Sequence, residues 1–167
     1  QELLDALFEG RNDSAGRSYL RQALYRLREV LPADLGPVQD GDRYRIPGRD
    51  TVVGTAEIVL GALTEADRQE GETRMRTLSS ALMQAERGPF LATLSSPWID
   101  ARRSEIDDRL TGARLDAARL AFRLGRYREA RGHVNDVLRR DPYREQGWQL
   151  ILTLAQASGD DDAVLAL

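Results

Sequence analysis

The stretch GRSYLRQALYRLREVL, residues 16–31, carries the most informative pattern in the chain. Four leucines recur at the spacing of one α-helical face and lie within about 60° of one another on a helical wheel; they are Leu20, Leu24, Leu27 and Leu31. The opposite side is polar, with Ser18, Arg21, Gln22, Tyr25 and Glu29. The pattern predicts an amphipathic helix whose leucine face packs on a core. Its polar face is either solvated or in contact with another molecule.

Composition excludes several classes of function. The chain has 167 residues, no cysteine and one histidine, so disulfides, thiolate chemistry and a multi-histidine metal centre are excluded. It contains no apolar run of about 18 residues, which a membrane span would need. No signal peptide is visible, and the first residues, QELLDALF, already follow a helical pattern. We therefore expect a cytoplasmic protein, and we interpret the chain as a fragment that continues upstream.

Charge is distributed unevenly along the chain. The formal net charge is −3, and all 24 basic residues are arginines. Residues 11–49 hold eight arginines against five acids, so the N-terminal quarter is locally basic. The simplest explanation for the absence of lysine is a GC-rich genome. Arginine nevertheless forms paired hydrogen bonds with phosphates and guanine edges.

The N-terminal 50 residues follow the element order of a winged helix-turn-helix. Residues 2–8 predict a short helix, residues 9–16 a loop, and Pro32 the end of the next helix. The segment VQDGDRYRI, residues 38–46, predicts a β-hairpin because the Asp40-Gly41 pair favours a tight turn. Helix, loop, helix and hairpin thus follow one another as in that fold.

The remainder, residues 51–167, is predicted to be almost entirely helical. We expect helices near residues 53–63, 71–86 and 98–124, with Pro89 and Pro97 interrupting the segment between the last two. The second of these helices has Met75, Leu78, Leu82 and Met83 as its apolar face. These helices would stack on the last third of the chain.

An internal repeat occupies that last third. Gly125 and Gly159 lie 34 residues apart, which is the period of tetratricopeptide helix-turn-helix repeats. Gly125 and Tyr127 would form the turn between two helices, and Ala130 would allow them to cross closely. Further positions agree with this register, namely Pro142 and Trp148. The fold class expected is therefore mainly α: a partial winged helix with a small β-hairpin, followed by a tetratricopeptide-like helical-repeat domain.

Candidate DNA-binding residues lie on the polar helix face and on the predicted wing. In a helix-turn-helix the second helix places its N-terminal residues in the major groove, where arginine pairs with guanine and glutamine with adenine. The wing would contact the backbone or the minor groove. The candidates are Arg17, Ser18, Arg21, Gln22 and Tyr25 on the helix and Arg43 and Arg45 on the wing. The simpler alternative is a solvated helix face.

Other noticeable residues have structural interpretations. Trp98 and Trp148 are expected to anchor the core, and His133 to be exposed or locally hydrogen-bonded. The GDDD segment at residues 159–162 is expected to be a turn and a helix start rather than a cation site. We find no nucleophile–base pair, no glycine-rich phosphate loop and no metal-ligand spacing, so we expect neither an enzyme nor a cofactor or metal.

Two long stretches resemble a known family. LLDALFEGRNDSAGRSYLRQALYRLREVLP, followed by VQDGDRYRI, resembles the C-terminal half of the OmpR-like winged helix of bacterial activators of the antibiotic-regulatory type. RGPFLATLSSPWIDARRSEIDDRL resembles the start of their bacterial transcriptional activator domain, through Gly88, Phe90, Leu91, Trp98, Arg102 and Glu105. The resemblance implies that residues 1–50 bind promoter DNA, usually as a dimer. It implies that residues 51–167 mediate assembly and contacts with RNA polymerase or other transcription machinery.

The sequence leaves a second interpretation open. The chain could be a helical-repeat scaffold for protein interactions whose vestigial winged helix binds no DNA. The negative net charge favours this alternative, and so do Asp40 and Asp42 in the wing, because carboxylates repel phosphate.

Overall fold

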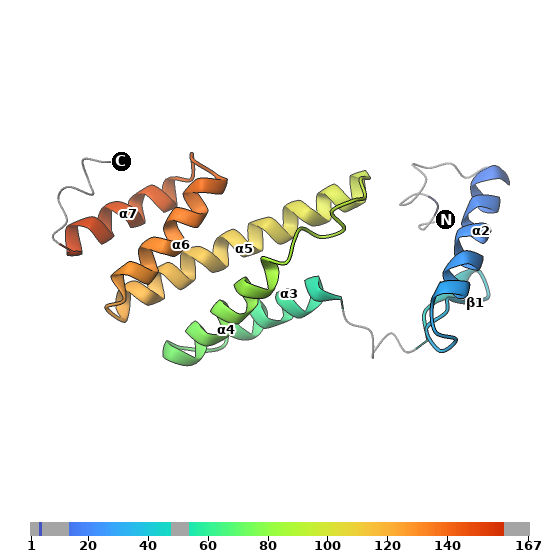
Figure 1. Cartoon of the computed structure of the whole chain (residues 1–167), viewed down its shortest axis with the longest axis horizontal. Helices are drawn as coiled ribbons and strands as arrows, with labels where there is room; N and C mark the ends of the chain where they lie inside the picture. Colours follow the sequence, from blue (N-terminus) through green and yellow to red (C-terminus); the bar gives the residue numbers. More distant parts are fainter. Residues whose placement is uncertain (1–3, 5–13, 48–53, 159–167) are drawn as a thin grey trace. The chain divides into compact units, whose positions relative to one another are not determined.

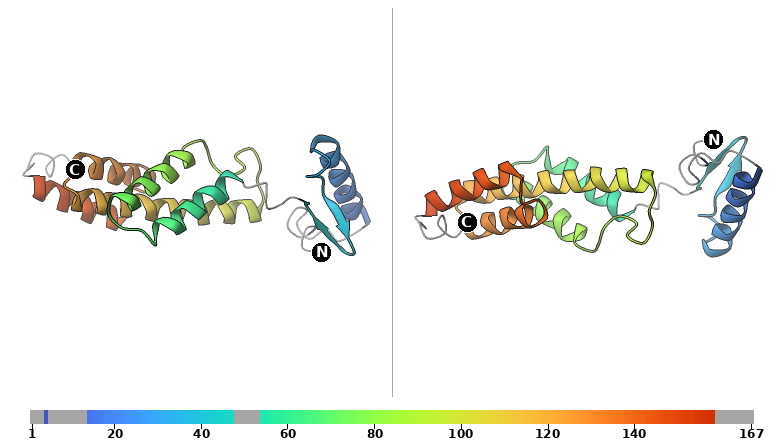
Figure 2. Two further views of the ribbon diagram at one scale, coloured as in Figure 1. Left: turned by 90° about the horizontal axis from the view of Figure 1, so that it is seen from below. Right: turned by 90° about the horizontal axis from the view of Figure 1, so that it is seen from above.

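The computed structural model describes residue 4 and residues 14–47 and 54–158. The chain divides into two compact units (Figures 1 and 2). One comprises Gln1–Gly54 with Thr93–Ala101, and the other Thr55–Ala92 with Arg102–Leu167. Of the short helix predicted at residues 2–8, only Leu4 is described, and it is helical and buried.

The first unit contains one long helix and a β-hairpin. Helix α2 (Ser14–Val30) includes the last three residues of the loop expected over residues 9–16, so that prediction is wrong at its end. Strands β1 (Val38–Asp40) and β2 (Arg43–Arg45) pair antiparallel, with Asp40 opposite Arg43. The two residues between the strands are Gly41 and Asp42, and Gly41 has a φ of 62°. The predicted hairpin is therefore confirmed, but its two-residue turn is Gly41-Asp42 rather than the expected Asp40-Gly41, because Asp40 still pairs in β1.

The second unit is built from helices. They are α3 (Thr55–Ala66), α4 (Gly71–Ala85), α5 (Pro97–Arg123, whose first turns are grouped with the first unit), α6 (Tyr127–Arg140) and α7 (Glu145–Ser158). Helices α3 and α4 lie side by side, as do α6 and α7 (Figures 1 and 2). The predicted fold class, mainly α with a small hairpin before the helices, is confirmed. Within the described residues, every helix is too short or too polar to cross a membrane.

Local sequence explains where α5 begins and ends. Pro97 occupies its first turn, where a missing N–H costs nothing, and the Ser96 hydroxyl accepts a hydrogen bond from Ile99 N at 3.4 Å. At the other end Gly125 has a φ of 75°. Gly125 N donates to Phe122 O at 3.0 Å and Arg126 N to Ala121 O at 2.8 Å, which is the Schellman pattern of bonds. The predicted inter-helix turn at Gly125 is therefore confirmed.

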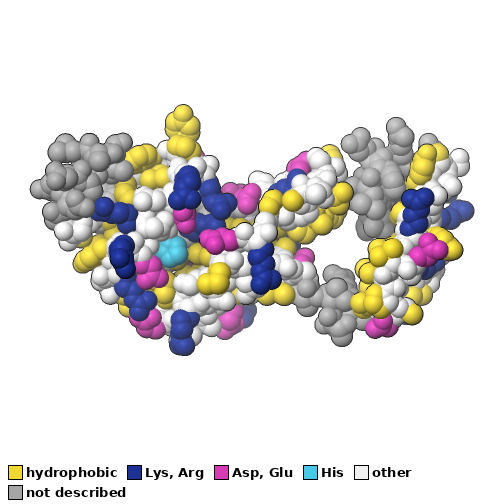
Figure 3. Space-filling model, in the orientation of Figure 1, with side chains coloured by type: hydrophobic (Ala, Val, Ile, Leu, Met, Phe, Trp, Pro, Cys, Tyr) yellow, Lys and Arg dark blue, Asp and Glu magenta, His cyan; other side chains and the backbone are white. Residues whose placement is uncertain are grey.

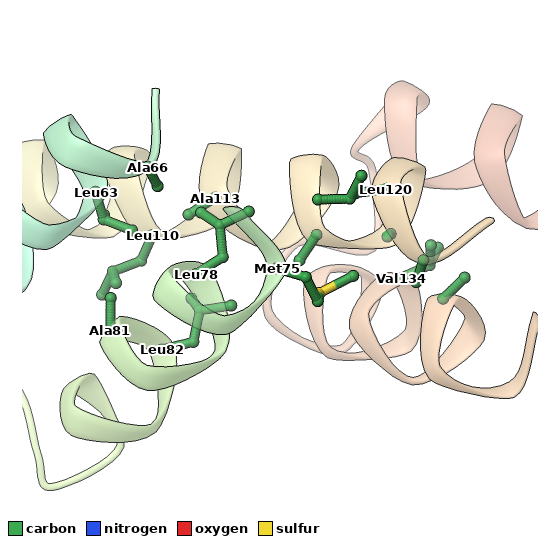
Figure 4. Packing of buried hydrophobic residues seen from close by; sticks show 14 of the residues in the cluster. Leu63, Ala66, Met75, Leu78, Ala81, Leu82, Leu110, Ala113, Leu120 and Val134 are labelled. Carbon is green, nitrogen blue, oxygen red and sulfur yellow. The ribbon is translucent and has the colours of Figure 1, made fainter. Parts of the chain in front are cut away.

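An apolar core joins α3, α4, α5, α6 and α7. Leu78 of α4 lies against Leu110 and Ala113 of α5 (Figure 4). The most deeply buried large side chains are Leu78, Val134, Val137 and Leu154. Burying each such side chain contributes about 1.5–3 kcal/mol relative to exposure. The core therefore supplies the main driving force for this unit.

Two expectations about apolar residues of this region are wrong. Met83 is 69% exposed, because it lies about 100° around α4 from Leu82 and outside the buried face of this helix. Trp98 is 43% exposed and does not anchor the core.

The structure describes part of the predicted repeat and can be compared with it there. Trp148 packs against the core, and its Nε1 donates to Pro142 O at 2.8 Å. Ala130, expected at the crossing of two helices, is fully buried. The second repeat glycine, Gly159, and the GDDD segment lie outside the described residues.

A buried charge lies between α5 and α6. Arg114 is only 3% exposed, and burial, followed by the nearby Arg140, lowers its pKa. His133 on α6 is half-buried rather than exposed. Burial is the largest influence on it and lowers its pKa below 6.5; Arg114 acts in the same direction, against the carboxylates of Glu129 and Asp136. The expectation of an exposed or hydrogen-bonded histidine is therefore wrong.

Two helical glycines provide a matched test of packing. An added Cβ at Gly112 meets nothing within 4 Å, so Gly112→Ala should raise the free energy of unfolding by about 0.5–1 kcal/mol through helix propensity. A Cβ at Gly147 would lie 2.7 Å from Leu138 Cδ2 and 3.1 Å from Leu138 Cγ. Overpacking costs about 1–3 kcal/mol, so Gly147→Ala should be at least about 1 kcal/mol less favourable than Gly112→Ala. Urea unfolding of both variants measures the difference, and equal gains would show that α6 and α7 are not in close contact.

The lowered pKa of His133 predicts a pH dependence of stability. Below pH 6.5 the unfolded chain binds a proton at this residue while the folded protein still leaves it neutral. The free energy of unfolding should therefore fall as the pH drops from about 7.5 to 5.5. His133→Gln should flatten the dependence in this range, as measured by urea unfolding at several pH values. Parallel curves for variant and parent would contradict the assignment.

Candidate nucleic-acid interface

The predicted DNA-binding residues of α2 are all exposed. Tyr25 is 61% exposed, and Arg17, Ser18, Arg21 and Gln22 are also classed as exposed. One helix therefore brings the five residues together, and Ser18, Arg21, Gln22 and Tyr25 share one polar face. Side chains of this kind, free of bulky cover, can reach base edges or phosphates.

The leucine face of α2 is less covered than expected. Leu20, Leu24 and Leu31 are half-buried, but Leu27 is 40% exposed. Val30 near the end of the helix is 82% exposed. The prediction of a core-packed leucine face is thus only partly fulfilled, because the described residues of this unit supply little apolar surface opposite it.

A contact that sequence reasoning missed links the helix to the hairpin. Arg28 Nε donates to Pro37 O at 2.7 Å, and both Gly36 and Pro37 are buried. Leu35 N donates to Pro32 O at 2.9 Å, which closes the turn that follows the helix. Arg28 therefore orients β1 relative to α2. In the sequence, one signal indicated that Arg28 is structural rather than ligand-binding: it lies beside the leucine face on the helical wheel.

The hairpin presents two arginines and two carboxylates. Arg43 and Arg45 are exposed on β2. Arg45 Nε lies 3.8 Å from Asp40 Oδ2, and their side chains are 64% and 76% exposed. Exposed ion pairs of this kind contribute about 0–1 kcal/mol, so Arg45 can exchange Asp40 for a phosphate at low cost. Asp40 and Asp42 weaken the positive potential of the hairpin.

Charged residues of the helical unit form structural pairs. Arg74 bridges Asp116 at 2.8 Å and Asp67 at 3.8 Å, which connects α4 to α5. Asp67 also accepts from Arg109 at 3.4 Å. Among the residues that the structure describes, no three histidine, aspartate or glutamate side chains are placed to hold a metal ion. The exposed polar face of α2 and the hairpin arginines are therefore the best-supported candidate site.

Comparison with known proteins identifies the larger part of the chain. The family model described as "Bacterial transcriptional activator domain" matches residues 55–166, which is more than half of the sequence and includes all the helices from α3 to α7. A search of curated proteins found no match. The chain therefore belongs to the bacterial transcriptional activator domain family.

Proposed function

We propose that this chain is a transcriptional regulator that binds promoter DNA through α2 and the hairpin. The division of labour follows the two parts named above: residues 1–50 contact DNA, and residues 51–167 mediate self-assembly or contact transcription machinery such as RNA polymerase. The observation that supports the proposal most directly is the exposure of Arg21, Gln22 and Tyr25 on one polar face. Family membership supports the regulatory role.

The polar face provides the chemistry that base recognition needs. An α-helix fits the major groove, and side chains near its N-terminal end approach base edges. Arg21 can donate two hydrogen bonds to guanine, and Gln22 can pair with adenine. Ser18 and Tyr25 carry hydroxyls that donate to phosphate oxygens, and Arg17 adds a positive charge near them. These contacts combine sequence readout with positioning on the backbone.

The hairpin would act through charge. The side chain of Arg43 makes no hydrogen bond or ion pair with any residue that the structure describes, and Arg45 is paired with Asp40 only at 3.8 Å between exposed side chains. Both guanidinium groups are thus available to a phosphate. Arginines in this role raise affinity for all duplexes equally, because phosphates carry no sequence information.

One observation favours the scaffold alternative. Asp40 and Asp42 flank Gly41 at the hairpin tip, and Asp40 pairs with Arg45. If this pair persists beside a duplex, the tip is close to neutral and the hairpin contributes no DNA affinity. The chain would then act as a helical-repeat interaction module.

The base-reading residues can be tested by selection and titration. Duplexes enriched from a random pool by the chain would be titrated with the parent and with Arg21→Ala and Gln22→Ala. Each substitution should cost about 1–3 kcal/mol on the selected sequence and relax preference at one base pair. Arg76→Ala, which removes an exposed arginine of α4, serves as the control and should leave affinity unchanged. Failure to enrich any sequence would contradict base reading by α2.

The hairpin arginines predict a different signature. Arg45→Gln should weaken binding to every duplex alike and lower the slope of log affinity against log salt by about 0.9. Asp40→Asn should strengthen binding, because it frees Arg45 and removes a repulsive charge. Titrations at several salt concentrations measure both effects. Unchanged slopes in both variants would support the scaffold alternative.

A further inference from the structure

Positive charge is concentrated in one segment of the helical unit. Residues 114–144 contain nine arginines and four acids, a formal charge of +5, whereas the whole chain carries −3. This segment includes the end of α5, all of α6 and the turn before α7. Figure 3 shows arginine side chains over this part of the molecule, with carboxylates between some of them. Whether this segment presents a positive surface therefore depends on how its arginines and acids are arranged around each helix.

One side of α6 carries arginines without carboxylates. Four polar residues recur at intervals of three and four positions and span about 80° of the helix circumference; they are Arg128, Arg131, Asn135 and Arg139, which we name the arginine stripe. The buried face of α6, with Ala130, Val134 and Val137, lies on the other side. Three stripe residues are exposed and Arg131 is half-buried.

The acids of α6 lie beside the stripe rather than within it. Glu129 and Asp136 occupy positions about 100° and 80° around the helix from Arg128. Arg139 Nη2 donates to Asp136 Oδ1 at 2.8 Å, yet its side chain remains 75% exposed. The side chain of Arg128 makes no hydrogen bond or ion pair within the described part of the chain. Arg128 and the largely exposed guanidinium of Arg139 thus leave donors facing solvent, whereas Arg131 is half-buried and has contacts within the protein.

The composition of the stripe favours a phosphate backbone over a protein partner. Protein interfaces are anchored by aromatic and apolar side chains at their centre, and this arc of α6 exposes none. Protein–DNA interfaces are more polar and strongly positive. From Arg128 to Arg139 the helix rises by about 16 Å, which corresponds to about five base-pair steps of a duplex.

We propose that the arginine stripe binds the phosphate backbone of duplex DNA without reading its sequence. This inference rests on the proposed function and extends it, because it assigns a DNA contact to the activator domain itself. Arg128, Arg131 and Arg139 donate to phosphate oxygens, and Asn135 adds a neutral hydrogen-bond donor between them. The contact raises affinity for all duplexes by the same factor.

The test compares two charge-matched triple variants of the whole chain. The stripe variant is Arg128→Gln/Arg131→Gln/Arg139→Gln. The control is Arg68→Gln/Arg76→Gln/Arg87→Gln, which removes three exposed arginines of the α3–α4 region. Both variants lose the same charge, so a difference between them reports position. Binding to a duplex of random sequence is titrated at several salt concentrations, with thermal melts to verify folding.

The stripe variant should lower the salt slope by about 2.7, which is 0.9 for each of three phosphate contacts, whereas the control should leave it near that of the parent. Equal slopes in the two variants overturn the inference. If the stripe variant instead keeps its DNA affinity but loses binding to polyglutamate, the stripe is a site for acidic protein and the inference also fails.

The same measurements separate this inference from the proposed function. If the stripe variant loses slope while Arg21→Ala changes no sequence preference, the stripe binds DNA and base reading by α2 fails. If Arg21→Ala relaxes preference while the two triple variants behave alike, the proposed function stands and the stripe assignment falls. Absence of any duplex binding by the parent at low salt overturns both.

Discussion

The helical unit depends on the face of α5 that is buried in the core shared with the other helices. The buried face of α5 is rich in alanine, with Ala117, Ala118 and Ala121 fully buried. These small side chains share the core with larger residues of other helices, such as Leu78 and Val134, which fill the space beside them. Larger side chains at these positions would force the helices apart. The ion pair of Arg74 with Asp116 lies at the edge of this contact and orients α4 along α5.

The packing of this unit also buries one charged side chain. Arg114 is enclosed between α5 and α6, and its side chain makes no hydrogen bond or ion pair within the described residues. Arginine stays protonated even there, because its ordinary pKa is far above neutral. Its charge is balanced only at longer range by Asp136, Glu86 and Asp107. The charge of Arg114 also disfavours protonation of His133, so a proton added to His133 would destabilise this interface.

Sequence reasoning located elements better than it located side chains. Helix ends follow from local chemistry, and Pro97 and Gly125 mark them without knowledge of the fold. The exposure of Met83 and Trp98 depends on which face another helix covers, and the burial of His133 depends on α5; neither is encoded in its own neighbourhood. Arg28 was missed for the same reason, since its partner is a backbone carbonyl nine residues away. The candidate interface was predictable because exposed polar faces follow from helical periodicity alone.

Two basic surfaces on one chain would play different physical roles. Contacts of α2 with base edges discriminate between sequences, because a wrong base leaves a buried donor or acceptor unpaired. Contacts of the arginine stripe with phosphates multiply specific and non-specific affinity by the same factor and leave their ratio unchanged. The ratio governs which site is chosen among many competitors, whereas the absolute affinity governs how long the protein stays. If both proposals hold, the second surface would lengthen residence on DNA, whereas the choice of site would still depend on Arg21 and Gln22.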